Sequence, residues 1–202
     1  MIDKETMDWI NSRIKRNAYI WLNYPVNDYL VDHLLMGAVY GNQKGIANQL
    51  SGFVSNPMEY AEASKLALYS IADYTWNMSD YDSLTSWNQG IKYLMPENEK
   101  AFKIFSENNI DLGPSGHGLR RADESADFKV VADRLTESYN KNIYPATYGN
   151  QLLQHFQSFR DASKELANST YNIPLREEIK PWLQAFDIIG QKGIALLDLY
   201  KN

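Results

Sequence analysis

The 202-residue chain contains no cysteine, which excludes disulfide bonds and thiol chemistry. It has no run of about 18 apolar residues, so no transmembrane helix is predicted. The polar N-terminus lacks the apolar stretch of a signal peptide. Its 20 basic residues are scattered among 25 acidic ones, and a net charge of -5 without a basic patch argues against nucleic acid as a partner.

Familiar catalytic and metal-binding patterns are also missing. There is no glycine-rich phosphate loop, no sequence context for a serine nucleophile, and no pair of acids at a strand end. Asp28, Asp32 and His33 do not have the spacing of a known ligand set, and Asp80 and Asp82 lack the glycine and glutamate of a calcium loop. We therefore expect no metal, no cofactor and no catalytic residue in this chain.

Apolar and aromatic residues are abundant. Hydrophobic residues make up 44% of the chain, which is enough to bury a core. Aromatic residues make up 13%, including 14 Tyr and 5 Trp. A flat ring either packs in the core, which is the commoner case, or matches the apolar face of a sugar.

Two short apolar segments each end in an asparagine near a proline. Strands are predicted over residues 18–23 and 52–55, followed by Pro25 and by Asn56 with its own proline. Parallel strands place ligand groups at their C-terminal ends, which makes Asn23, Asp28 and Asn56 candidates for binding hydroxyl groups. The alternative is that Asp28 and Asn56 cap the helices that follow them.

Helical spacing dominates the rest of the chain. We predict a helical turn at 46–50 and helices over residues 5–15, 28–36, 57–76, 81–94, 97–108, 126–141, 146–168 and 176–200. No strand is predicted after Asn56. The fold class is therefore mainly α, a helical bundle preceded by the last two βα units of an incomplete (β/α)8 barrel, with domains at residues 1–56 and 57–202.

A glycine-rich loop at residues 113–118 interrupts the helices. His117 in this loop stands close to Arg120 and Arg121, which together allow an anion site. The commoner interpretation is that the loop closes a junction between two helices.

Several long segments resemble the bacterial O-GlcNAcase and hyaluronidase-like enzymes of glycoside hydrolase family eighty-four. The similar segments are residues 21–29, 32–35, 52–59, 61–65 and 111–118, together with the two arginines that follow. The resemblance covers nearly the whole chain in order and spacing. It implies a (β/α)8 barrel followed by a helical bundle, of which this chain holds the last two barrel strands and the bundle.

The resemblance also implies a reaction and a sugar pocket. The family removes β-linked N-acetylglucosamine by substrate-assisted catalysis, with paired aspartates on an earlier barrel strand, and no Asp-Asp pair occurs here. Asp28 matches the family's acid that holds the 4- and 6-hydroxyls. Asn23 and Asn56 match two pocket asparagines, and Trp21 matches the tryptophan that walls the pocket.

We therefore expect the C-terminal fragment of a β-N-acetylglucosaminidase that is inactive alone. Its expected partners are a glycan or glycoprotein containing N-acetylglucosamine and the missing N-terminal half of the barrel. The resemblance suggests a secreted or periplasmic location in bacteria, with any signal outside this chain. Unpaired strand edges predict that residues 1–55 rearrange or self-associate. The second hypothesis is a non-enzymatic helical interaction module whose barrel remnant only packs.

Overall fold

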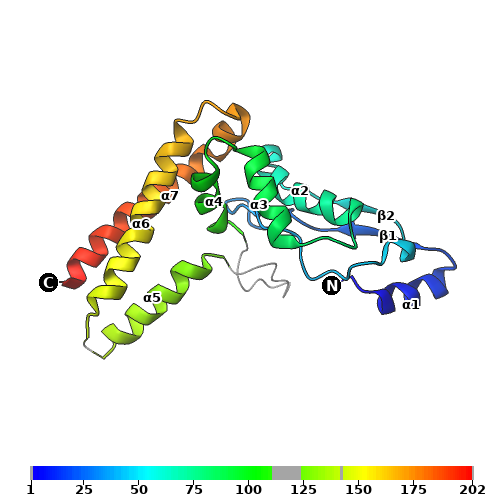
Figure 1. Cartoon of the computed structure of the whole chain (residues 1–202), viewed down its shortest axis with the longest axis horizontal. Coiled ribbons are helices and arrows are strands. Elements are labelled where there is room, and N and C mark those ends of the chain that lie inside the picture. The colour runs from blue at the N-terminus through cyan, green and yellow to red at the C-terminus, as the bar shows by residue number, and fades with distance from the viewer. Residues whose placement is uncertain (1, 111–123, 142, 202) are drawn as a thin grey trace. The chain divides into compact units, whose positions relative to one another are not determined.

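The structure is a computed structural model that describes residues 2–110, 124–141 and 143–201 (Figure 1). The predicted loop at 113–118, with His117, Arg120 and Arg121, lies outside the described residues. Contacts divide the chain into two compact units, residues 2–94 with 109–110, and residues 95–108 with the described residues from 124 onward. Among the described residues, no helix is both long and apolar enough to cross a membrane.

The first unit combines a small sheet with three α-helices. Its elements are α1 (Lys4–Ile14), β1 (Ala18–Leu22), the 3-10 helix η1 (Ala47–Gln49), β2 (Leu50–Ser55), α2 (Ala61–Trp76) and α3 (Ser83–Leu94). The structure confirms both strands, the first helix, the turn at 46–50 and the helix over 81–94, with ends that differ by the usual one or two residues.

Strands β1 and β2 pair in parallel, as the sequence predicts. The register places Ile20 opposite Phe53, and Gly52 opposite Tyr19. A Cβ atom at Gly52 would come within 2.3 Å of the Tyr19 ring, so glycine is what allows this close approach. Parallel pairing brings the C-terminal ends of both strands to the same edge of the sheet.

Residues 23–46, which connect the strands, form an irregular loop with no α-helix. The helix predicted over residues 28–36 is therefore wrong. Buried backbone groups need hydrogen-bond partners, and in this loop side chains from α2, α3 and the turn between them supply them. The bonds are Trp87 Nε1 to Met36 O (2.8 Å), Tyr74 Oη to Gln43 O (2.9 Å), Tyr81 Oη to Val39 O, and Val39 N to Ser70 Oγ (2.9 Å).

The two tyrosines in this set are buried, with only 1% of Tyr74 and 5% of Tyr81 exposed. Burial disfavours the charged phenolate and raises the pKa of both Tyr74 and Tyr81 above the usual value for tyrosine. Both side chains therefore stay protonated at neutral pH, as hydrogen-bond donors to the loop.

Helix α2 begins at Ala61, later than the predicted start at residue 57. The capping role considered for Asn56 is therefore wrong, and Tyr60 occupies the N-cap position without a side-chain cap. Asn56 instead continues the pairing of the strands. Its N–H donates to Leu22 O at 2.9 Å, and its carbonyl accepts from Val26 N–H at 2.9 Å.

Asp82 caps the first turn of α3, because its Oδ1 accepts from Thr85 N–H at 2.8 Å. This hydrogen bond lowers the pKa of the Asp82 carboxyl. A lowered folded-state pKa stabilises the fold above the unfolded pKa, and this stabilisation is lost as pH falls through the folded value. Asp82→Asn keeps a capping oxygen that does not titrate, so its melting temperature should fall less steeply than wild type below about pH 4.

The measurement is thermal unfolding across an acidic pH series. Asp80→Asn is the matched control, because Asp80 lies in the same segment and precedes the helix without capping it. Equal slopes for Asp82→Asn and wild type would contradict the prediction.

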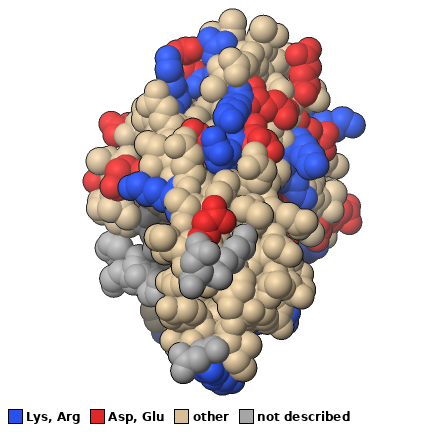
Figure 2. Space-filling view, turned by 90° about the vertical axis from the view of Figure 1, so that its left-hand side faces the viewer, with Lys and Arg blue, Asp and Glu red and all other residues tan. Residues whose placement is uncertain are grey.

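The second unit is a helical bundle, which confirms the sequence-based prediction for this region. It contains α4 (Glu99–Glu107), α5 (Ala126–Tyr139), α6 (Ala146–Ala167) and α7 (Ile173–Lys201). Helix α6 packs against each of the other three. Fully buried side chains at this core are Phe102, Phe105, Leu166, Leu175 and Ile179. On the face in Figure 2, basic and acidic side chains are interspersed rather than gathered by sign.

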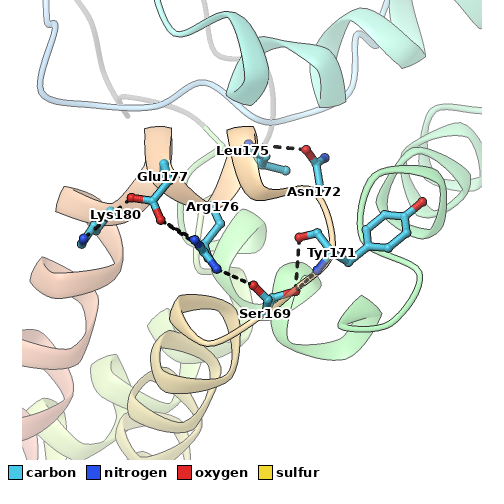
Figure 3. A network of polar contacts seen from close by, with 7 residues as sticks. All are labelled: Ser169, Tyr171, Asn172, Leu175, Arg176, Glu177 and Lys180. Atoms are coloured by element: carbon cyan, nitrogen blue, oxygen red, sulfur yellow. Dashed lines mark hydrogen bonds and ion pairs between the residues drawn. The ribbon is translucent and has the colours of Figure 1, made fainter.

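A polar network holds the turn between α6 and α7 (Figure 3). Arg176 Nη1 donates to Ser169 O at 2.8 Å, and Tyr171 N–H donates to Ser169 Oγ at 3.2 Å. Arg176 also pairs with Glu177 at 2.6 Å, and this bond lowers the pKa of the Glu177 carboxyl. The network satisfies backbone groups that the helix ends leave without partners.

Candidate functional site

The C-terminal ends of β1 and β2 lie side by side and carry the two predicted asparagines. The last strand pair is Leu22 with Ser55, and each is followed directly by an asparagine, Asn23 and Asn56. The bond from Asn56 N–H to Leu22 O continues the pairing one residue beyond the strands. Backbone pairing therefore fixes the distance between the main chains of Asn23 and Asn56.

A side-chain hydrogen-bond cluster joins three of the four predicted residues. Trp21 Nε1 donates to Asn23 Oδ1 at 2.7 Å, and Asn56 Nδ2 donates to the same oxygen at 3.3 Å. Trp21 and Asn23 are two residues apart on an extended strand, so their side chains leave the same face. Trp21 is 67% exposed, which leaves its ring open to a ligand.

The chemistry of the indole fixes the orientation of the Asn23 amide. An indole N–H only donates, so the atom that it meets on Asn23 is the carbonyl oxygen. That oxygen accepts two hydrogen bonds within the cluster, and the Asn23 Nδ2 group remains to donate elsewhere. Asn56 keeps its Oδ1 as an acceptor. The cluster therefore offers both a donor and an acceptor beside an exposed aromatic ring.

Asp28 is exposed on the loop that follows β1, outside this hydrogen-bonded cluster. No helix begins there, so the cap role considered for Asp28 is wrong. Its carboxylate makes no hydrogen bond or ion pair among the described residues. The bond from Val26 N–H to Asn56 O, at 2.9 Å, ties the backbone two residues before Asp28 to the end of β2.

Two residues that were not predicted as site residues, Tyr24 and Ser55, help to hold these strand ends in place. Ser55 Oγ donates to Tyr24 O at 2.6 Å, and Tyr24 Oη donates to Gly37 O at 2.6 Å. Tyr24 is 2% exposed. Its position between Asn23 and Pro25 gives no periodic signal of burial, so only its large aromatic ring hinted at a place in the core.

No group of three or more His, Asp or Glu side chains in the described residues is arranged to hold a metal ion. An open groove lies elsewhere, between α5 and α6 in the second unit. Its lining residues are Asp127, Val130, Val131, Gln151, Gln154, His155 and Ser158. None of them was predicted as a site residue, and the His155 ring packs edge-on against Phe128 with centroids 5.9 Å apart.

Models of two known protein families match this chain. Residues 1–107 match the beta-N-acetylglucosaminidase family, and residues 124–202 match the family described as the bacterial GH84 post-catalytic domain. The chain belongs to the beta-N-acetylglucosaminidase family. The resemblance stated from sequence segments is thereby confirmed.

Curated relatives match a shorter part of the chain. The protein O-GlcNAcases of Rattus norvegicus and Mus musculus are each 30% identical over 83 residues, which is 41% of this chain. Those residues make up 9% of either relative. The chain thus spans a small share of these proteins' length.

Solved structures match the fold over 98% of this chain. CpGH84D has a TM-score of 0.88 at 32% identity, and CpGH84B has a TM-score of 0.86 at 26% identity. A mutant O-GlcNAc hydrolase of Thermobaculum terrenum has a TM-score of 0.84 at 24% identity, which shows the fold alone. The chain covers 33%, 34% and 41% of these three chains, respectively.

Proposed function

We propose that this chain is the C-terminal part of a glycoside hydrolase that removes β-linked N-acetylglucosamine by substrate-assisted catalysis. It contributes sugar-binding residues and lacks the catalytic aspartate pair. Residues 1–56 would form the edge of the barrel, and residues 57–202 the helical bundle. Family membership supports the reaction class, and the absence of any Asp-Asp pair in the sequence supports the division of labour.

The observation that carries the proposal is the hydrogen bond from Trp21 to Asn23, with Asn56 on the same oxygen. It holds an exposed ring and two amides together at the strand ends, where barrel enzymes bind ligands. In the proposed site the Trp21 ring forms one wall of the sugar pocket. The Asn23 and Asn56 amides bond its polar groups, and Asp28 accepts the 4- and 6-hydroxyl protons.

The chemical steps are assigned to the part of the barrel outside this chain. There, one acid would orient the 2-acetamido group, which attacks the anomeric carbon to give an oxazoline. A neighbouring acid would protonate the leaving oxygen. Water then opens the oxazoline and releases N-acetylglucosamine. The residues of this chain take no part in proton transfer, and their role is to hold the non-reducing sugar in place.

Hydrolysis of an aryl N-acetylglucosaminide tests this division. We expect no turnover by the purified 202-residue chain, and turnover by a protein in which the chain is joined to the remaining barrel strands. Circular dichroism confirms beforehand that the purified chain is helical. Turnover by the purified chain would show that it holds its own acid or nucleophile, and the proposal would be wrong.

A further inference from the structure

Asn27, the neighbour of Asp28, is a buried polar residue next to the exposed segment of residues 28–32. It is 1% exposed, and its Nδ2 donates to His33 O at 2.6 Å. A buried side-chain amide needs a hydrogen-bond partner, and here the partner is a backbone carbonyl six residues further along the chain. The bond therefore closes residues 27–33 into a ring.

The segment inside this ring lies at the surface of the first unit. Residues 28–32 are all exposed. Two turn bonds, from Leu30 N–H to Asn27 O at 2.9 Å and from His33 N–H to Leu30 O at 3.2 Å, lie within the ring. Tyr60 Oη reaches Val31 O from outside at 2.9 Å. The ring contains no buried apolar side chain that would fix its position by packing.

Both ends of the ring, in contrast, continue into anchored backbone. On the N-terminal side, Val26 N–H is bonded to Asn56 O at the end of β2. On the C-terminal side, Leu35 N–H donates to Met58 Sδ at 3.2 Å, and Met36 N–H donates to Asn109 O at 2.8 Å. The Asn27 bond is a side-chain link between these two anchored ends.

We propose that Asn27 is a positioning residue for Asp28. By closing the ring at the first unit's anchored backbone, it fixes the direction from which the Asp28 carboxylate approaches the sugar hydroxyls. This inference rests on the proposed function, because it assigns Asn27 a role only through the Asp28 contact. Charged hydrogen bonds depend on distance and angle, so a loop that samples many positions binds more weakly than one held in place.

A double-mutant cycle tests the proposal in the protein in which the barrel is complete. The variants are Asn27→Ala, Asp28→Ala and both together, and the readout is the dissociation constant of N-acetylglucosamine. We expect Asn27→Ala to weaken binding by about three- to tenfold, which corresponds to the free energy of one hydrogen bond that orders the loop. In the Asp28→Ala background, the same change should have less than about a twofold effect, because residues that act through one another are not additive.

Ser70→Ala is the matched structural control. Ser70 is also buried in the first unit and also bonds the backbone of the loop, through Val39 N–H at 2.9 Å, but outside the ring. Its loss should lower the melting temperature and leave the dissociation constant unchanged. Asn27→Ser keeps a short donor and should restore part of the affinity. It also serves as the test variant if Asn27→Ala does not fold.

Four results would overturn the inference. An unchanged dissociation constant for Asn27→Ala with a lower melting temperature would make Asn27 purely structural, as would failure of both Asn27 variants to fold. An equal effect of Asn27→Ala in both backgrounds would mean that it does not act through Asp28. If Asp28→Ala itself leaves binding unchanged, the Asp28 contact of the proposed function is wrong, and the inference about Asn27 is wrong with it. The other results leave the Asp28 contact intact, so the two failures can be distinguished.

Discussion

Replacing Asp28 with alanine, in a protein in which the barrel is complete, should weaken N-acetylglucosamine binding by about ten- to hundredfold. A hydrogen bond to a charged group contributes about 1.5–3 kcal/mol, and one carboxylate can accept two hydroxyl protons. The Asp28 carboxylate is exposed and has no competing partner among the described residues, so both oxygens are available to a ligand. Isothermal titration calorimetry measures the dissociation constant of each variant directly.

Asp32→Ala is the matched control for this substitution. Asp32 is an exposed carboxylate of the same loop, and its loss changes the local charge by the same amount. We expect its affinity for the sugar to stay within about twofold of wild type, because Asp32 is not among the residues proposed to contact the sugar. An unchanged affinity for Asp28→Ala together with a lower melting temperature would favour the helical interaction module instead.

The part of this site that the sequence predicts is the part built from local geometry. Strand alternation places Trp21 and Asn23 on one face, and parallel pairing brings Asn56 to the same edge. The spacing of apolar and polar residues predicts the strands and their polar ends at Asn23 and Asn56, whereas the role of Trp21 is implied only by the family resemblance. The structure adds the hydrogen bonds that link the three side chains and set the direction of the amide.

The failed helix over residues 28–36 shows what local spacing misses. Leu34 and Leu35 have helical spacing relative to Leu30, but Leu34 and Leu35 are buried while Leu30 is exposed. The loop keeps its irregular path because Trp87 and Tyr81 bond its carbonyls from far along the chain. Tertiary partners at that sequence distance outweigh a weak helical preference and leave no local signal.

The caps were misjudged for a related reason. Asn before Pro is a good start signal for a helix, and Asn56 fits it. In the structure, the backbone of Asn56 is hydrogen-bonded to Leu22 and Val26, and residues 56–60 form no helix. Helix α2 therefore begins only at Ala61. The backbone hydrogen bonds of Asn56, which the sequence alone does not reveal, therefore exclude the helix-capping role.

Close packing of α6 against α7 also depends on residues that sequence periodicity does not highlight. Gly190 faces the backbone of α6, where an added Cβ would lie 2.7 Å from Phe156 O and 2.5 Å from Arg160 Cγ. Gly193 faces the Phe156 ring, with an added Cβ 2.3 Å from it. Glycine inside a helix is intrinsically unfavourable, so its presence at these positions reflects the short distance between the helices.

Gly190→Ala should therefore destabilise the second unit by about 1–2 kcal/mol. Overpacking typically costs about 1–3 kcal/mol, and the better helix propensity of alanine returns up to about 1 kcal/mol of that. The clash is with a backbone carbonyl, which moves only if the helices separate. Separation also strains the pair between Arg160 Nε and Asp187 Oδ1, which are 3.1 Å apart. Urea unfolding followed by circular dichroism gives the free energy of unfolding.

Gly193→Ala is the matched control in the same helix. The three atoms nearest to its added Cβ all belong to the Phe156 side chain, which can shift more easily than a backbone carbonyl, so a smaller loss of stability is expected than for Gly190→Ala. If the two variants lose equal stability, the backbone contact is not what limits the approach of α6 and α7. If Gly190→Ala is more stable than wild type, helix propensity outweighs packing at this crossing, and the close contact is not needed for the bundle.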